Sequence, residues 1–258
     1  MTATADRGSA ALAGLRVAGL AAWFLACLVP HLLSKLILRH SRWPRRFLAG
    51  VAWIAGARVT LTGPPPARRT LLLANHTSWL DIVVLAGATG TSFVSKAEIG
   101  GVALIGWLAD QNHTLYVDRA ARRDSHRQID QVRAGLDRAW PLAIFPEGTT
   151  GDGTDLLTFR STLLSAVAPP PPGVAVQPVA IDYGAATAEI AWHGGEAGLA
   201  NVRRVLGRRS TIPVTVRLLD PLPVLADRKL LADQARAAIA AALPSICRAP
   251  PPHRSRSD

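Results

Sequence analysis

The stretch TLLLANHTSWLDIVVLA, residues 70–86, decides the fold. Its first five residues form a short apolar run, which is typical of a strand buried on both faces of a sheet. Residues 79–86 form a second apolar run, which we predict to be a helix. A buried strand that passes through a short polar turn into a helix is the building unit of an α/β sheet.

The same alternation continues along the chain. Apolar runs predict further strands at residues 91–95, 114–117, 142–145, 174–181 and 212–218, and helices at residues 102–109, 124–140 and 225–243. We therefore predict an α/β fold, with one domain over residues 57–245 built on a central, mostly parallel mixed sheet flanked by helices. The Pro-, Arg- and Ser-rich residues 246–258 are predicted to be a disordered tail.

Residues 1–56 are predicted to be membrane-associated helices. Residues 17–29 carry no charge, and the apolar character continues to Leu38. A full span needs about 20 apolar residues, so this stretch is short for one. A signal peptide is disfavoured because no small-residue cleavage site follows. The favoured interpretation is a transmembrane or re-entrant helix kinked at Pro30, and the alternative is an interfacial helix in the headgroup layer.

Residues 43–54 form a second apolar element with a tryptophan near each end. This element is either a helix packed on the domain or one that seeks the membrane interface, where tryptophan is favoured. More basic residues follow the first apolar stretch than precede it, so the positive-inside rule places the rest of the chain in the cytoplasm. We expect a protein of the cell inner membrane with its active site on the cytoplasmic side.

Composition points to lipid rather than nucleic acid as the partner. Hydrophobic residues make up 49% of the chain, mean hydropathy is +0.20 and the formal net charge is +11. Such a charge attracts anionic partners. Only 5% of the residues are aromatic, and none of them alternates with basic residues as in a single-strand binder. The two cysteines, Cys27 and Cys247, lie far apart, so neither a disulfide framework nor a zinc site is expected.

The strongest chemical signal is NHTSWLD, residues 75–81, directly behind the first buried strand. Ligands of open α/β sheets bind at the carboxyl ends of strands. A histidine there can take a proton from a hydroxyl, and a nearby carboxylate orients it. Positions five apart on a helix point about 140° apart, so His76 and Asp81 meet only if His76 lies in the loop and Asp81 in the first helical turn. Ser78 would be the N-cap. The alternative is a capping box of Ser78 and Asp81, with His76 uninvolved.

A second polar segment, FPEGTTGDG, follows the strand at residues 142–145. Its glycines and hydroxyls offer hydrogen-bond donors to a polar headgroup, and Glu147 can accept from a hydroxyl or an amine. The third segment is YVDR, where Arg119 can bind a phosphate bidentately. Taken singly, the two segments also fit an ordinary glycine-rich turn and a surface salt bridge.

Together these segments resemble the glycerolipid acyltransferase family, whose members include 1-acylglycerol-3-phosphate acyltransferase. Four blocks match in the family's order: Asn-His-x-Ser-x-x-Asp at 75–81, Val-Asp-Arg at 117–119, Phe-Pro-Glu-Gly-Thr at 145–149, and a proline-containing strand at 176–179. The resemblance covers roughly residues 71–181.

The resemblance implies an O-acyltransferase that moves a fatty acyl group from acyl-CoA or acyl-carrier protein to the hydroxyl of a lysolipid, without a covalent acyl-enzyme. His76 would be the general base and Asp81 its orienting partner. The predicted acceptor-binding residues are Asn75, Ser78, Arg119, Glu147, Gly148, Thr149 and Arg160. No metal and no prosthetic cofactor is implied, and the partners are the acyl donor, the lipid acceptor and the membrane surface.

The acceptor stays open between two lysolipids. Many phosphate-accepting members carry a basic residue where this chain has Thr150. The departure resembles the branch that acylates lyso-ornithine lipid, an aminolipid without phosphate. Arg160 could supply the missing charge instead, so 1-acylglycerol-3-phosphate remains the other candidate.

Two functions of other classes compete with acyl transfer. An esterase or lipase needs a nucleophile with its base and acid, and the Gly-x-Ser-x-Gly elbow is missing around Ser78. A non-catalytic lipid-binding protein would have no use for His76 and Asp81.

Overall fold

The computed structural model describes residues 9–244 except 40, 118–124 and 139. The predicted tail therefore lies outside the described residues. In the described part, the strands are β1 Ala57–Thr62, β2 Thr70–Ala74, β3 Ser92–Lys96, β4 Leu115–Val117, β5 Leu142–Ile144, β6 Ala175–Asp182 and β7 Ile212–Leu218. The α-helices are α1 Ala10–Leu38, α2 Trp43–Ile54, α3 Leu80–Thr89, α4 Ala97–Gly100, α5 Ala103–Gln111, α6 Ser125–Leu136, α7 Thr187–Ile190, α8 Gly198–Gly207 and α9 Arg228–Ala242, and the 3-10 turns are η2 Leu163–Val167 and η3 Gly184–Ala186.

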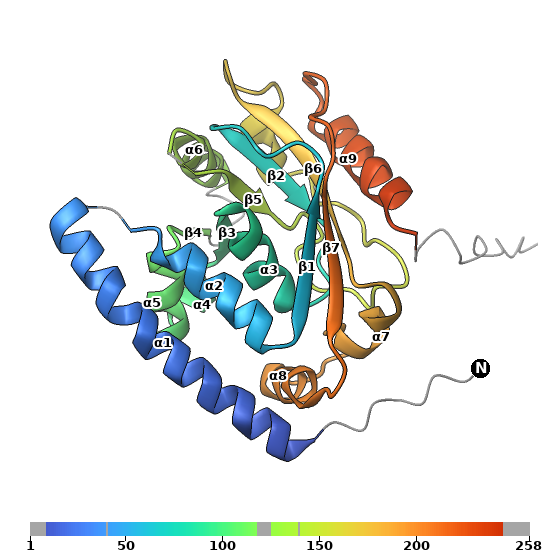
Figure 1. Cartoon of the computed structure of the whole chain (residues 1–258). Helices are drawn as coiled ribbons and strands as arrows, with labels where there is room; N and C mark the ends of the chain where they lie inside the picture. The colour runs from blue at the N-terminus through green and yellow to red at the C-terminus, as the bar shows by residue number, and fades with distance from the viewer. Residues whose placement is uncertain (1–8, 40, 118–124, 139, 245–258) are drawn as a thin grey trace, which may run out of the picture.

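These strands form one sheet in the order β1-β7-β6-β2-β5-β3-β4 (Figure 1). Every neighbouring pair is parallel except β6 with β7. The predicted α/β class with a mostly parallel mixed sheet is confirmed. The sequence prediction missed β1, because only Ala57 of this edge strand is buried and the others face solvent.

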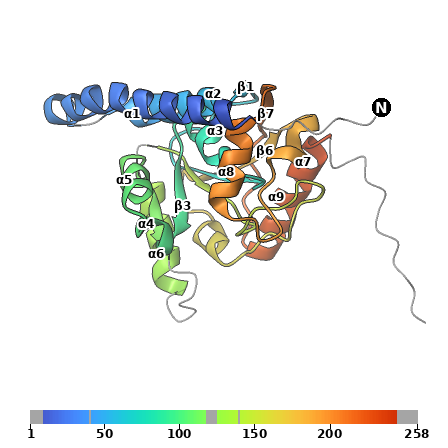
Figure 2. The same ribbon diagram turned by 90° about the horizontal axis from the view of Figure 1, so that it is seen from below.

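Helices cover both faces of the sheet (Figure 2). Along β2, Leu72 packs with α2, α3 and α8, whereas Leu71 and Leu73 pack on the other face with α6, η2 and α9. This two-sided burial explains why β2 is a continuous apolar run. Helices α2 and α3 approach closely at Gly87, where a side chain would meet the Ala49 backbone at 2.7 Å.

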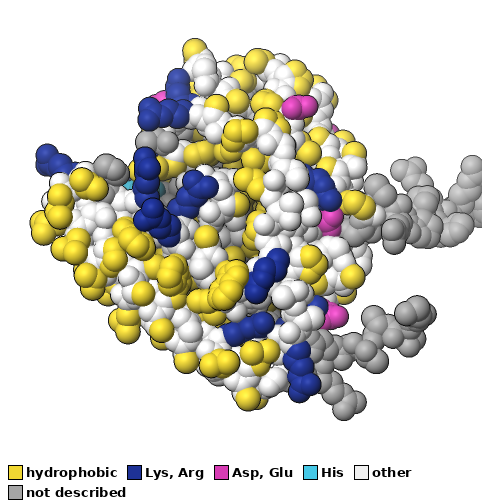
Figure 3. All heavy atoms as spheres, viewed as in Figure 1, with side chains coloured by type: hydrophobic (Ala, Val, Ile, Leu, Met, Phe, Trp, Pro, Cys, Tyr) yellow, Lys and Arg dark blue, Asp and Glu magenta, His cyan; other side chains and the backbone are white. Residues whose placement is uncertain are grey.

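Helix α1 lies along the outside of the molecule against α2 and α8. It continues through Pro30, and one 18-residue apolar window of it is long enough to cross a membrane, with 11% of that window buried. Figure 3 shows hydrophobic side chains along α1 with lysine and arginine side chains gathered beside it. The predicted boundary at residue 57 falls between α2 and β1, which pack against each other.

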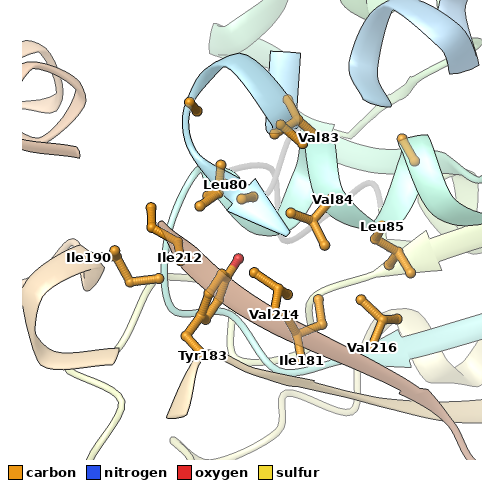
Figure 4. Packing of buried hydrophobic residues seen from close by; sticks show 14 of the residues in the cluster. Leu80, Val83, Val84, Leu85, Ile181, Tyr183, Ile190, Ile212, Val214 and Val216 are labelled. Carbon is orange, nitrogen blue, oxygen red and sulfur yellow. The ribbon is translucent and has the colours of Figure 1, made fainter. Parts of the chain in front are cut away.

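The core beneath α3 positions the site. Leu80, Val84 and Leu85 pack against Ile181 of β6 and Val214 of β7 (Figure 4). All five are fully buried or nearly so. The first turn of α3 is thereby held against the ends of β6 and β7, next to Tyr183.

Candidate active site

The first two polar segments meet at the carboxyl edge of the parallel strands. β2 pairs with β5 so that Leu73 stands beside Ile144. Two parallel strands in this register release their following loops at the same level, so His76 and Glu147 emerge side by side. The link is direct: the His76 N–H donates to Glu147 Oε1 at 2.7 Å.

His76 and Asp81 are paired. His76 Nδ1 lies 2.9 Å from Asp81 Oδ2, with His76 in the loop and Asp81 in the first turn of α3, as the spacing requires. Asp81 is fully buried, and its Oδ2 also accepts the N–H groups of Thr77 at 2.7 Å and Ser78 at 2.8 Å. A buried carboxylate needs such donors to remain charged.

Residues 75–81 contain both the predicted His76–Asp81 pair and part of the alternative, a capping box of Ser78 and Asp81. Asp81 accepts the Ser78 N–H, which is the returning half of a capping box, and with the same oxygen it holds His76. The N-cap position itself belongs to Trp79 rather than Ser78. Ser78 Oγ accepts a long 3.4 Å contact from the Leu80 N–H and is buried. The same Asp81 oxygen therefore stabilises the start of α3 and binds His76 in the candidate catalytic pair.

The loop after β5 clamps the His76 backbone. Glu147 accepts the His76 N–H with Oε1 and the Leu157 N–H, at 2.9 Å, with Oε2. The Gly151 N–H donates to the His76 carbonyl at 2.9 Å. Glu147 is only 3% exposed, and this burial raises the pKa of its carboxyl group against the lowering effect of the two N–H donors.

The His76 ring is held on its other sides as well. It stacks on Phe145, with 4.1 Å between ring centroids and 14° between planes, and Phe145 stacks in turn on Phe93. The His76 side chain remains 17% exposed. Nδ1 is taken by Asp81, so Nε2 is the ring nitrogen left for a substrate.

Several residues predicted to bind the acceptor make hydrogen bonds within the protein. Asn75 exchanges two hydrogen bonds with the Ile181 backbone, joining the ends of β2 and β6, and is 4% exposed. Ser78 is buried, and both oxygens of Glu147 are occupied. These side chains connect the segments of the site through bonds inside the protein, and their acceptor-binding role stays a prediction.

The remaining predicted residues are placed as follows. Thr149 is exposed, and Gly148 has a positive φ of 76° that suits glycine in the turn after β5. Arg160 is exposed, with its backbone N–H bonded to the Pro146 carbonyl at 2.8 Å. Arg119 lies outside the described residues. No group of metal-ligating side chains is found in the part of the chain that the structure describes.

Thr150 and Tyr183 have roles that the sequence did not indicate. The Thr150 hydroxyl donates to the Trp192 carbonyl and so ties the loop after β5 to the segment before α8. The Tyr183 hydroxyl donates to Asp81 Oδ1 at 2.6 Å. Tyr183 directly follows β6, so its place at the carboxyl edge was the available signal.

Comparison with known proteins identifies the family. A family model described as Acyltransferase matches residues 58–182. The lyso-ornithine lipid O-acyltransferase of Pseudomonas aeruginosa is 38% identical over 232 residues, which cover 87% of each chain. The 1-acyl-sn-glycerol-3-phosphate acyltransferase of Neisseria gonorrhoeae is 32% identical over 111 residues, covering 43% of this chain and 44% of that one.

A solved structure shares the fold. The 1-acyl-sn-glycerophosphate acyltransferase PlsC of Thermotoga maritima superposes with a TM-score of 0.58 at 18% identity, covering 90% of this chain and 95% of that one. The protein is thus an acyltransferase. It belongs to the glycerolipid acyltransferase family, as its four sequence blocks predicted.

Proposed function

We propose that the enzyme transfers a fatty acyl group from an acyl-CoA or acyl-carrier-protein thioester to the hydroxyl of lyso-ornithine lipid. The observation that carries the chemistry is the His76–Asp81 pair, with Nδ1 bound at 2.9 Å and Nε2 left for a substrate. Nε2 takes the proton of the acceptor hydroxyl as its oxygen attacks the thioester carbonyl. The C–S bond then breaks, and the leaving thiolate takes the proton from the His76 imidazolium.

Direct transfer fits the site better than hydrolysis through an acyl-enzyme. A nucleophilic serine must expose its hydroxyl to the ester and to its base. Ser78 is fully buried, and its N–H is committed to Asp81. The esterase alternative therefore lacks its nucleophile at the obvious position.

The choice of acceptor is supported by the extent of the two likenesses. In sequence, the lyso-ornithine lipid enzyme of Pseudomonas aeruginosa matches 87% of the chain, whereas the glycerol-phosphate enzyme of Neisseria gonorrhoeae matches 43% of it. Glu147 gives no support for an amine-bearing acceptor, because both of its carboxylate oxygens already accept backbone N–H groups.

An assay with both acceptors tests the proposal. Purified enzyme is given a labelled acyl donor and equal concentrations of lyso-ornithine lipid or lysophosphatidic acid. We expect product from the aminolipid and little from the phosphate. Strong activity on lysophosphatidic acid alone would overturn the acceptor, and release of free fatty acid without an acceptor would overturn transfer itself.

We further propose that the enzyme lies on the cytoplasmic face of the inner membrane with α1 in the interface. Three polar contacts tie α1 to the body along its length: Arg16 to the Leu206 carbonyl at 3.0 Å, Trp23 to the Phe47 carbonyl at 3.1 Å, and His31 to Gln111 at 3.0 Å. Residues 16 to 31 cover about 22 Å of helix. A helix fixed over that distance cannot cross the bilayer unless the body enters with it, so the geometry favours the interfacial alternative over a span.

The outer surface of α1 is apolar. Leu25, Leu36 and Ile37 are 63%, 80% and 72% exposed. Basic residues beside α1 in Figure 3 complement anionic headgroups. Helix α5, which contacts α1 through Trp107 and Gln111, adds Leu104 and Ile105, both more than half exposed.

Substitution tests this contact better than deletion, because α1 also packs into the core through Ala13. The triple variant Leu25→Ser, Leu36→Ser, Ile37→Ser should stop floating with phosphatidylglycerol-containing vesicles in high salt. Val224→Ser with Leu230→Ser is the matched control, since both residues are exposed near α9. Continued flotation of the triple variant would place the contact elsewhere.

A further inference from the structure

Tyr183 makes an unusual contact with the candidate catalytic carboxylate. Its hydroxyl lies 2.6 Å from Asp81 Oδ1, and the two residues are 1% and 0% exposed. Burial, reinforced by the Asp81 charge, raises the pKa of the Tyr183 phenol well above its usual value. The phenol therefore stays protonated and donates its hydrogen bond throughout the range in which the enzyme can be assayed.

The four donors around Asp81 are divided unequally. Oδ2 accepts from His76 Nδ1 and from the Thr77 and Ser78 N–H groups, whereas the Tyr183 hydroxyl is the donor to Oδ1. A carboxylate held at both oxygens has one orientation. The backbone donors come from the His76 loop itself, so only Tyr183 ties the carboxylate to another element of the sheet.

We propose that Tyr183 is a positioning residue for acyl transfer, which fixes the Asp81 carboxylate and through it the direction of His76 Nε2. This inference rests on the proposed roles of His76 and Asp81. The backbone that carries Tyr183 is held in place. Asn75 binds Ile181, two residues before Tyr183, to the end of β2 with hydrogen bonds of 2.8 and 3.0 Å. The Tyr183 ring packs among Leu80, Ile190 and Ile212 (Figure 4).

Tyr183→Phe removes one oxygen and keeps the ring in this core. Asp81 Oδ1 is then left without a donor in a site closed to water. Its charge is less dispersed and holds the proton on His76 more tightly, so the neutral base is available only at higher pH. We expect kcat to fall roughly 10-fold or more, KM for the acceptor to change less than about twofold, and the acid limb of the kcat/KM profile to move to higher pH.

The chain offers a matched control. Tyr116, the other tyrosine, also donates to a carboxylate, Asp110, at 2.9 Å, but on α5 rather than at the site. Tyr116→Phe therefore removes the same atom from the same kind of bond and should leave the acid limb in place. In that variant Tyr183 is the sole tyrosine, so 3-fluorotyrosine incorporation labels it alone.

Fluorotyrosine gives the opposite perturbation without removing the bond. The fluorinated phenol is a stronger donor and should move the acid limb to lower pH, which keeps the proposal testable if Tyr183→Phe does not fold. An acid limb that stays in place in both proteins would overturn the proposal. If His76→Ala is inactive in the same assay, the base assignment survives that failure.

A double-mutant cycle adds a second readout. If Tyr183 acts through Asp81, Tyr183→Phe should cost little further activity once Asp81→Asn has been made. Equal losses in the presence and absence of the Asp81 carboxylate would show that Tyr183 supports the fold alone and would overturn the positioning role.

Discussion

The loops after β2 and β5 look alike in sequence but differ in what they do. Each follows a buried parallel strand and carries an acidic or basic group together with small polar residues. In the loop after β2, His76 keeps one ring nitrogen for a substrate. In the loop after β5, both oxygens of Glu147 accept hydrogen bonds from backbone N–H groups, and the Thr150 hydroxyl donates to the Trp192 carbonyl.

A polar residue at this edge of the sheet can therefore serve the structure of the site, as Glu147 does through its bonds to two backbone N–H groups. The loop after β5 supplies Glu147 Oε1, the Gly151 N–H and the Phe145 ring to three sides of His76. We predict that the loop after β2 presents the base and that the loop after β5 restricts its motion. Rate enhancement by orientation depends on such restriction as much as on the reacting group.

The largest effect is expected at His76. His76→Ala removes the base, which costs about 10² to 10⁴ in rate. The backbone bonds to Glu147 and Gly151 are kept, so the melting temperature should change little. Near-normal acyl transfer by the purified, folded variant would break the division between the two loops, because the reacting group would then lie elsewhere.

A smaller effect is expected at Glu147. The kinetic parameters separate two possible roles of this residue, restraint of the His76 backbone and binding of the acceptor. Glu147→Gln replaces one acceptor oxygen by an NH₂ group that faces a backbone N–H, so the clamp on His76 opens. We expect kcat to fall roughly 10- to 100-fold while KM for the acceptor stays within about twofold.

Asp152→Asn is the matched control for Glu147. Asp152 lies in the same loop and is exposed, and it bonds only Thr154 two residues on, at 2.9 and 2.7 Å. Its kinetics should be near normal. A raised KM with unchanged kcat in Glu147→Gln would instead restore the acceptor-binding role that the motif suggested.

The edge of the sheet at which the site lies could be predicted from sequence because it depends on strong, local signals. Buried apolar runs mark β2 and β5, and parallel pairing brings the residues behind them together. The pairing of His76 with Asp81 follows from their spacing once the helix start is placed. The edge strand β1 was missed although its sequence, ARVTLT, alternates apolar and polar residues.

The contacts inside the site could not be predicted in the same way. Nothing in the sequence tells which backbone N–H groups Glu147 will accept, because this depends on how two loops from distant segments pack. Tyr183 is an isolated aromatic residue without a motif, and it meets Asp81 only through the pairing of β6 with β2. The sequence motif predicts that Asn75 binds the acceptor, and nothing in the sequence indicates the two hydrogen bonds of its side-chain amide with the Ile181 backbone.

The smallest expected effect is a difference in pH dependence between the two carboxylates of the loop after β5. Burial raises the pKa of Glu147, whereas the Thr154 backbone and hydroxyl donors lower the pKa of Asp152. A folded-state pKa above the unfolded value means that the folded chain holds its proton more tightly. The contribution of Glu147 to stability is therefore full below its unfolded pKa and declines as pH rises through the folded one. For Asp152 the sign is reversed: its contribution is present above the unfolded pKa and is lost as pH falls.

Denaturant unfolding of the wild type, Glu147→Gln and Asp152→Asn between about pH 4 and pH 7 measures both signs. The stability advantage of the wild type over Glu147→Gln should shrink as pH rises, at about 1.4 kcal/mol for each unit by which the pKa is raised. The advantage over Asp152→Asn should grow slightly, since solvent screens an exposed group. If the two stability advantages changed in the same direction with pH, Glu147 would not be a buried carboxylate with a raised pKa. The contrast drawn between the loop after β5 and the loop that carries His76 would then fail.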